Sequence, residues 1–415
     1  MSKSGFKGQI FGIDLSDCSI KIAQIKKRGG KFILTNIGRQ NLPLGIINQG
    51  IIEKNREVEL VNFIRKATAN VWGRKIKSKY TICSLPEEES FIKVIQIPKV
   101  EEREIGKMVQ WQIESNFPVE LNDIYFDWEV VPPFRGGKSV SKKADEILNV
   151  SVAVIPKKIV DSYLSVFKKA GLQPVAFEIE SMSVIRSLFK GPFSPHPVIV
   201  VDIGRDSSGL VIFSGWTIIF TSHINISSED FTKLISEKLN VNLDKADRFK
   251  KEIGLLNLQK IHKVSREEIS SLPKQKIYHV PIVQNGEIGM LKSVTATEKI
   301  IGLKEIEDVF NALVPLLENF TEGIKQYVDY LKSFEGIEFV PDGKVGRIIL
   351  CGGGANLIGL TDFLSYNLGL PVEVGNPLIN ISKFTCFKKG EIPKKEEMLS
   401  YTTALGLALR GANYH

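Results

Sequence analysis

Hydrophobic and polar residues alternate along three short stretches near the start of the chain, with glycine or small polar residues between them. Alternation with a period of two predicts β-strands, and the short separations predict hairpins. The same arrangement begins again near residue 198. This repeated opening predicts two related halves. The predicted strands are 9–14, 19–26 and 31–37 in the first half, and 198–203, 210–213 and 216–224 in the second.

Elsewhere, apolar residues recur three and four positions apart, which predicts amphipathic helices. The helices are expected at 57–71, 101–116, 158–169, 181–189, 229–253, 303–333, 360–368 and 400–409. Further strands are expected at 80–85, 90–97, 124–131, 146–155, 174–178, 276–283, 347–351 and 372–374. Pro315 predicts a kink in the longest helix, and three prolines within 191–197 predict a linker. Strands alternating with helices indicate an α/β protein.

The chain is too long for one ordinary hydrophobic core, since it has 415 residues. Residues 87–155 have a different pattern of predicted elements, namely a strand, a helix and a hairpin. We interpret them as an inserted α/β subdomain. The expected divisions are a first-lobe core at 1–86 and 156–197 (the latter including the linker), the inserted subdomain at 87–155, a second-lobe core at 198–237 and 341–398, a second-lobe subdomain at 238–340, and a helix at 399–415 that returns to the first lobe.

Composition narrows the class of protein. Hydrophobic residues make up 43% of the chain and charged residues 25%, which is typical of a globular protein. The net charge is +8, but no run of five Lys or Arg residues occurs, so we expect no nucleic-acid partner. No apolar run approaches the roughly 18 residues of a membrane span, and residues 1–8 do not look like a signal peptide. We therefore expect an intracellular protein that meets a membrane only through a partner.

Cysteine and histidine indicate no site of their own. The four cysteines (Cys18, Cys83, Cys351 and Cys386) are far apart and contain no CxxC pair, so we expect reduced thiols. The five histidines share no spacing typical of metal ligands, and no serine stands in a GxSxG motif.

Three turns carry the candidate chemistry. In the first two, an aspartate (Asp14 or Asp202) ends a strand, small residues follow, and a second strand begins, which predicts a hairpin. A turn of small residues can direct backbone N–H groups at phosphate oxygens. The preceding carboxylate can hold Mg²⁺, usually through water. The turn residues are Ser16, Asp17, Cys18 and Ser19 in the first turn, Gly204, Arg205, Asp206, Ser207 and Ser208 in the second, and Gly352, Gly353, Gly354 and Ala355 in the third.

Two aspartate-started hairpins followed by a late triple glycine resemble the actin-like ATPase superfamily. The motif Trp111-Gln112-Ile113-Glu114-Ser115-Asn116-Phe117-Pro118-Val119, followed by Tyr125-Phe126-Asp127, is similar to the inserted subdomain of the PilM family of type IV pilus assembly. The motifs Leu85-Pro86-Glu87, Ala170-Gly171-Leu172, Gly369-Leu370-Pro371-Val372-Glu373-Val374 and the segments 350–360 and 401–408 are similar to signatures of the same family. The resemblance covers nearly the whole chain and is weaker over 255–299.

This resemblance implies a two-lobed actin-like (ribonuclease H-like, duplicated) ATPase fold with an FtsA/PilM-type inserted subdomain in the first lobe. It further implies an ATP-binding cytoplasmic adaptor, peripheral at the inner face of the inner membrane, in a type IV pilus or related secretion machine. The adaptor would bind the N-terminal cytoplasmic tail of a PilN-like membrane protein in a groove lined by the 101–119 region. Other pilus platform proteins and the assembly ATPase are further expected partners, and a homo-oligomeric state is left open.

The resemblance also implies roles for individual residues. Asp14 and Asp202 match the Mg²⁺-proximal aspartates, and Lys21 matches a lysine that reaches the phosphates of ATP or ADP. The three turns match two phosphate loops and an adenosine turn. Asp247 and Lys250 match a helix that contacts ribose and base. Glu178 and Glu180 lie where the lobes connect, and either one could position the attacking water.

The chain departs from the family pattern in the first two turns. Ser16 stands where glycine is usual, which removes free access to positive φ. Asp17 and Asp206 add negative charge, and a carboxylate about 4 Å from a triphosphate would oppose binding by roughly 4 kcal/mol at an effective dielectric constant near 20. We therefore expect ATP binding with slow or absent hydrolysis. We expect Trp111 to pack in the core of the inserted subdomain.

Three alternatives remain open at this stage. An FtsA-like cell-division filament protein shares the superfamily, but its usual linker and membrane helix are not found after residue 409. A sugar kinase would need a catalytic aspartate and polar contacts to a sugar, whereas the inserted subdomain is more typical of protein binding. A nucleotide-free actin-fold scaffold would explain the acidic turns.

Overall fold

The computed structural model describes most of the chain. The described residues are 9–116, 120–132, 146–255, 278–284, 287–294, 303–332, 344–385, 387 and 394–414, with the backbone alone at 278–284 and 287–294. Most of the loop expected at 132–138, between the strands predicted at 124–131 and 146–155, lies outside them, as do most of 255–299 and Cys386. The chain forms two compact units. The first unit contains residues up to Asp230, Asn319–Asn356 and the residues from Leu364 onward, and the second contains Phe231–Glu318 and Leu357–Phe363.

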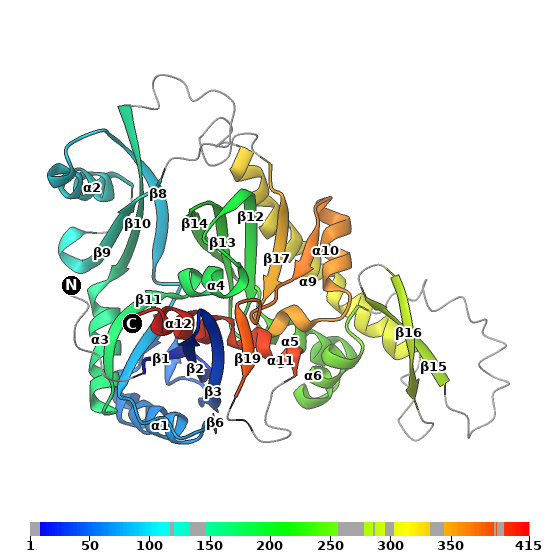
Figure 1. Ribbon diagram of the computed structural model, residues 1–415. Helices are drawn as coiled ribbons and strands as arrows, with labels where there is room; N and C mark the ends of the chain where they lie inside the picture. The colour runs from blue at the N-terminus through cyan, green and yellow to red at the C-terminus, as the bar shows by residue number, and fades with distance from the viewer. Residues whose placement is uncertain are drawn as a thin grey trace. The chain divides into compact units, whose positions relative to one another are not determined.

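The first sheet of the first unit is built around the first predicted hairpins (Figure 1). Its strands are β1 (Phe11–Ser16), β2 (Ser19–Arg28), β3 (Lys31–Asn41), β7 (Tyr80–Leu85), β11 (Gln173–Ile179) and β19 (Ile381–Phe384), with β6 (Trp72–Gly73) paired to β3. Strands β1, β2 and β3 form an antiparallel meander. On the other side of β1, strands β7 and β11 run parallel to it. The order is β11-β7-β1-β2-β3-β19.

The second sheet repeats this topology. Its core strands are β12 (Ser194–Ile203), β13 (Ser208–Gly215), β14 (Thr217–Ile224), β17 (Arg347–Cys351) and β18 (Val372–Val374). Here β12, β13 and β14 are the antiparallel meander, and β17 and β18 run parallel to β12 on its other side. The repeated sequence pattern therefore corresponds to a repeated sheet topology.

Three strands of the expected inserted subdomain extend the second sheet beyond β14. They are β8 (Phe91–Pro98), β10 (Ile147–Pro156) and β9 (Ile124–Val130), and they follow in that order. Helix α2 (Glu102–Asn116) buries Ile105, Val109 and Ile113 against them. Trp111 lies on the opposite side of this helix and is 67% exposed. The prediction that Trp111 packs in the core is therefore wrong, because the helical period of 3.6 turns it away from the buried positions.

Helices cover both faces of the first sheet (Figure 1). On one face lie α1 (Glu57–Ala69) and α3 (Lys157–Lys169), whose apolar residues join the core of β1 and β2. On the other face lie α4 (Glu180–Leu188) and α12 (Thr402–Ala412), which pack against each other. Helix α4 also packs against the second sheet, where Ile185 and Leu188 contact Val200 and Phe213. The α4–α12 pair therefore joins the cores of the two sheets.

The remaining elements of the first unit are short. They are the hairpin β4 (Ile47–Asn48) and β5 (Ile51–Ile52), helix α11 (Lys395–Met398), and the 3₁₀ turns at Lys54–Arg56, Leu121–Asp123, Gly353–Asn356 and Leu399–Tyr401. Helix α10 (Leu360–Leu368) has residues in both units. In the described part of the chain, none of the helices combines the length and the apolar character that crossing a membrane would require.

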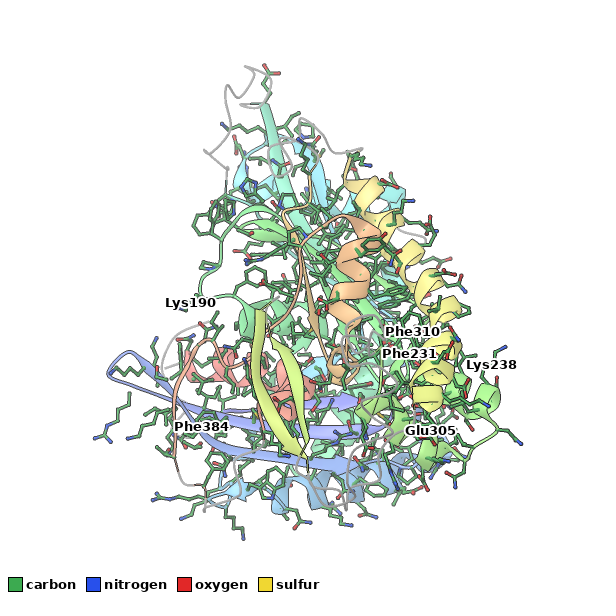
Figure 2. All side chains as sticks on the ribbon, turned by 90° about the vertical axis from the view of Figure 1, so that its right-hand side faces the viewer. Lys190, Phe231, Lys238, Glu305, Phe310 and Phe384 are labelled. Carbon is green, nitrogen blue, oxygen red and sulfur yellow. The ribbon has the colours of Figure 1, made fainter. Side chains whose placement is uncertain are left out.

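The second unit is mainly helical. It contains most of α5 (Ser228–Leu239), α6 (Leu243–Glu252), the hairpin β15 (Tyr278–Gln284) and β16 (Glu287–Val294), and the first half of α9 (Leu303–Lys332). The single helix predicted at 229–253 is two helices, because Asn240 has a φ of 49° and Asn242 caps α6 by accepting a hydrogen bond from the Lys245 N–H. Pro315 lies inside α9, which continues as one helix. Lys238 and Glu305, labelled in Figure 2, help to line a cavity of about 560 Å³.

The predicted linker at 191–197 is shorter than expected. Strand β12 begins at Ser194, which pairs with Gly215, and the next paired residue is Val198, opposite Phe213. The ladder is irregular between these pairs because Pro195 and Pro197 have no N–H group to donate. Proline therefore marks an interruption within a strand here, and the sequence pattern alone did not distinguish this from a linker.

The α4–α12 contact depends on Gly406. A Cβ atom at this position would lie 1.9 Å from the backbone oxygen of Ser183 in α4. We expect Gly406→Ala to lower the free energy of unfolding by about 2–3 kcal/mol, because two backbones must separate. Urea unfolding followed by circular dichroism measures this. Gly191→Ala is the control, since nothing lies within 4 Å of a Cβ there, and equal losses in both variants would contradict the prediction.

Candidate functional site

The first turn places Asp14 and Lys21 directly opposite each other on β1 and β2. The Lys21 Nζ atom lies 2.9 Å from Asp14 Oδ2, and the Ser84 hydroxyl of β7 donates a hydrogen bond of 3.2 Å to Asp14 Oδ1. Asp14 is 3% exposed. Burial alone would lower the pKa of Lys21, but the charge of Asp14 and its hydrogen bond raise it above its ordinary value. This lysine therefore stays charged beside a buried carboxylate.

Within the turn, serine and aspartate side chains bond to different partners. The Ser16 hydroxyl donates to the Ser19 carbonyl oxygen at 3.1 Å and lies 3.3 Å from the Ser19 hydroxyl. The Asp17 carboxylate accepts hydrogen bonds from the N–H groups of Gln49 and Gly50, at 2.6 and 3.0 Å. Burial raises the pKa of Asp17, although these two bonds oppose the shift. Both Asp17 oxygens are thus engaged by the β4–β5 turn.

The second turn follows Asp202, the residue next to last in β12. The Gly204 N–H donates to the Ser207 carbonyl oxygen at 2.9 Å and closes the turn. The Arg205 guanidinium lies 3.3 Å from the Glu229 carboxylate, so its charge is paired with the start of α5. The Ser208 hydroxyl donates to the Ile226 carbonyl oxygen at 2.6 Å. Asp206 hydrogen-bonds with the Cys18 thiol and raises its pKa, an effect that adds to that of burial. Asp206 and Cys18 therefore connect the first two turns.

The glycine turn packs directly on Asp202. Gly352 has a φ of 78°, and a Cβ there would lie 2.2 Å from Asp202 Oδ1. A Cβ at Gly354 would lie 2.3 Å from the Ile203 side chain. Only glycine allows this close approach. Ala355 is buried, whereas a Cβ at Gly353 would make only an ordinary contact, 4.0 Å from the Ser400 Cβ.

The structure brings several carboxyl groups into one electrostatic environment around these turns. Burial raises the pKa of Asp202 to about 6, helped by Asp14 and Glu88 and opposed by Lys21. Burial, followed by Asp14, Glu88 and Asp202, raises the pKa of Glu180 well above its usual range. Among the described residues, none donates a hydrogen bond to the carboxylate of Asp202 or of Glu180. These two carboxylates are therefore available to a ligand.

Two members of this group, Glu87 and Glu88, were missed by sequence reasoning. They follow β7, a buried strand that runs parallel to β1, so they lie at the same sheet edge as the first turn. Burial raises the pKa of Glu87 to about 7, and its Oε2 atom accepts a 3.0 Å hydrogen bond from the Ser181 N–H of α4. Three consecutive glutamates after a buried strand were the available signal.

Glu178 and Glu180 differ sharply. Glu178 is 2% exposed, and its carboxylate lies 2.6 Å from Arg186 of α4 and 2.9 Å from Arg410 of α12. This arrangement ties β11 to the two helices between the sheets. Glu180 opens α4 and carries no such ion pair among the described residues. Between the two, the geometry favours Glu180 for a role in the site.

Asp247 and Lys250 belong to the second unit. The Lys250 Nζ atom lies 3.2 Å from Asp247 and donates a 2.6 Å hydrogen bond to the Thr232 hydroxyl. Lys251 also pairs with Asp247. The structure brings these two residues together on α6.

The charges around the turns would suit a divalent cation held through water. In the described part of the chain, no three His, Cys, Asp or Glu side chains are arranged to hold a metal ion directly. Several carboxyl groups with raised pKa values nevertheless face one another, and Lys21 opposes only part of their charge. A cation held through water would reduce this repulsion, in the way that Mg²⁺ commonly binds.

The pKa of Glu87 predicts a pH dependence of stability. A carboxyl group with a raised pKa binds its proton more tightly in the folded state, so its stabilisation is full below pH 4.5 and is lost as the pH rises through about 7. In the presence of EDTA, we expect the wild type to lose about 3 kcal/mol of its free energy of unfolding through Glu87 as the pH rises from 4.5 to 8. Glu87→Gln should not show this loss. Unfolding from pH 4.5 to 8 measures it, with the exposed Glu114→Gln as control. An unchanged slope in Glu87→Gln would refute the prediction.

Two family models match the chain. The model of "Type IV pilus assembly protein PilM" matches residues 12–259, more than half of the chain, and includes the first hairpin and the inserted elements. The model of "Cell division protein FtsA" matches residues 199–406.

Solved structures resemble the chain as well. The "PilM-PilN type IV pilus biogenesis complex" has a TM-score of 0.70 and 20% identity, covering 98% of this chain and 99% of the other. EutJ, the ethanolamine utilization protein from Carboxydothermus hydrogenoformans, has a TM-score of 0.48 and 12% identity, covering 98% and 91%. MreB 5 of Spiroplasma citri bound to AMPPNP has a TM-score of 0.47 and 13% identity, covering 91% and 95%.

The expected actin-like fold is confirmed. The FtsA-like alternative is the weaker one, because the structural match over nearly the whole of both chains is with PilM and the PilM model alone covers the inserted elements. The chain therefore belongs to the family of type IV pilus assembly protein PilM.

Proposed function

We propose that this protein is an ATP-binding adaptor at the cytoplasmic side of a type IV pilus assembly platform, where it holds the N-terminal tail of a PilN-like membrane protein. The observation that carries the proposal is the match to the PilM family together with a full-length structural match to a PilM seen in complex with PilN. The same adaptor would serve a related secretion machine.

The nucleotide part of the proposal rests on the three turns. Asp14 and Asp202 would hold Mg²⁺ through water, and the cation would supply charge neutralisation between carboxylates and phosphates. Lys21, which is paired with Asp14 at 2.9 Å, would exchange this partner for a phosphate oxygen. Gly352 and Gly354 keep side chains out of the adenosine turn. Glu178 would maintain the fold, and Glu180 is the better candidate to orient water. We expect slow or absent hydrolysis.

Mg-ATP is expected to stabilise the protein, since a ligand that binds only the folded state raises its melting temperature. At about 100 times the dissociation constant the gain is about 2.7 kcal/mol. Asp14→Asn and Asp202→Asn should lose the gain because each removes a carboxylate for the cation, and EDTA should abolish it in the wild type. Differential scanning fluorimetry measures these shifts.

Asp123→Asn is the control for these variants, because Asp123 is exposed and lies in a 3₁₀ turn of the inserted elements. It should keep the full shift. Folded, nucleotide-free wild-type protein that shows no shift at millimolar Mg-ATP would favour the nucleotide-free scaffold instead.

The tail-binding part of the proposal draws on exposed aromatic residues. Trp111 on α2, Tyr125 on β9 and Phe91 on β8 are all exposed on strands and a helix of the inserted region. The Tyr125 hydroxyl donates to Asp161 at 3.2 Å, and the Lys157 Nζ atom lies 5.5 Å from the Tyr125 ring centroid. Exposed aromatic side chains held in place are typical of protein-binding surfaces.

Trp111→Ala is expected to weaken binding of a synthetic PilN tail peptide at least tenfold, because a large exposed aromatic side chain is the type of residue that dominates binding energy. Fluorescence anisotropy of the labelled peptide measures this. Trp216→Ala is the matched control: Trp216 is also exposed, but it lies at the β13–β14 turn and packs on Phe193. Equal affinity in both variants would remove Trp111 from the proposed surface.

A further inference from the structure

Glu88 contacts the second turn in a way that the proposed function does not require. Residues 87–90 form a tight turn, closed by hydrogen bonds of 3.1 and 3.2 Å from the N–H and hydroxyl of Ser90 to the Glu87 carbonyl oxygen. Glu88 stands at the corner of this turn. Its Oε1 atom accepts a hydrogen bond of 2.5 Å from the Ser207 hydroxyl. A carboxylate that follows β7 is therefore bonded to a turn that follows β12.

Ser207 is one of the residues proposed to face phosphate. Its carbonyl oxygen is already used by the Gly204 N–H, which fixes the shape of the turn. Its hydroxyl has one proton to donate, and that proton goes to Glu88. A phosphate oxygen needs the same donor. Glu88 and a phosphate group are therefore competitors for one hydrogen bond.

The charge of Glu88 also acts on the rest of the site. It raises the pKa of several neighbouring groups, which places its negative charge among them. These groups are Asp17, Glu87, Tyr163, Glu180 and Asp202. A triphosphate entering this environment meets the same repulsion, because the interaction of two like charges depends only on their distance and the local dielectric.

We propose that Glu88 is a built-in competitor of the nucleotide phosphates, and that it sets the affinity of the site by occupying Ser207 when no nucleotide is bound. This inference rests on the proposed nucleotide site. It makes Glu88 a residue that lowers affinity, in contrast to Asp14 and Asp202, which raise it through the cation. Nucleotide binding would then include the release of the Glu88–Ser207 bond.

The test compares wild type, Glu88→Gln and Glu88→Ala at one pH, with excess Mg²⁺. Gln keeps an acceptor for Ser207 and removes only the charge, so the turn should stay folded. We expect Glu88→Gln to bind Mg-ATP about tenfold more tightly, equivalent to about 1.4 kcal/mol, and Glu88→Ala at least as tightly. Adenosine, which carries no phosphate, should bind all three proteins equally. Isothermal titration calorimetry measures these affinities.

Glu89→Gln is the matched control. Glu89 is the next residue in the same turn and is also half-buried, so the variant removes the same charge at a place without a bond to the second turn. Its Mg-ATP affinity should stay near that of the wild type. An equal gain in Glu88→Gln and Glu89→Gln would show a general charge effect and would overturn the specific role of Glu88.

The outcomes separate this inference from the proposed function. Wild-type binding with equal or weaker binding by Glu88→Gln would overturn the inference and leave the nucleotide site intact; weaker binding would show that Glu88 helps to hold the cation. If Glu88→Gln binds Mg-ATP and the wild type does not, the result would support both the nucleotide site and the competing role of Glu88. Absence of Mg-ATP binding in every variant would refute the nucleotide site and, with it, the inference.

Discussion

The organisation of this protein depends on holding several carboxyl groups close together in a largely buried site. Electrostatic repulsion opposes this, as the raised pKa values of Asp202, Glu87 and Glu180 show. The fold resists that repulsion with the hydrogen-bonded strands of two sheets of the same topology and with the buried ion pair Lys21–Asp14. The glycine turn at Gly352 packs closely against Asp202 of the second sheet. A divalent cation would neutralise part of this negative charge, and the bound cation would in turn attract the phosphates of a nucleotide.

Local features could be predicted from the sequence because their causes are local. The hairpin turns after Asp14 and Asp202 follow from small residues between alternating strands, and the repeated meander follows from the repeated pattern. Helix α10 and strands β7, β17 and β18 have the predicted bounds. The repeated pattern also predicted two related halves, the family resemblance supplied the actin-like fold, and the expected domain boundaries remain predictions.

Most of the features that the sequence did not reveal at the site are contacts between residues far apart along the chain. Nothing near Asp17 indicates that its carboxylate bonds to Gln49 and Gly50. No role was predicted for Glu87 or Glu88, because only the parallel pairing of β7 with β1 places them at the site. Helical periodicity could have shown Trp111 to be exposed, but the large apolar side chain suggested the core. The roles of the individual site residues in nucleotide binding remain predictions.

The position of α12 has a consequence for biosynthesis. This helix, at residues 402–412, covers Ala23, Ile25, Leu34 and Ile37 of hairpins that leave the ribosome long before it. Almost 400 residues must be translated before that apolar face can be buried, which takes about 20 seconds or more at the usual elongation rates. During that time the nascent sheet exposes an aggregation-prone surface, so a chaperone that shields early hairpins would have most to contribute before translation is complete.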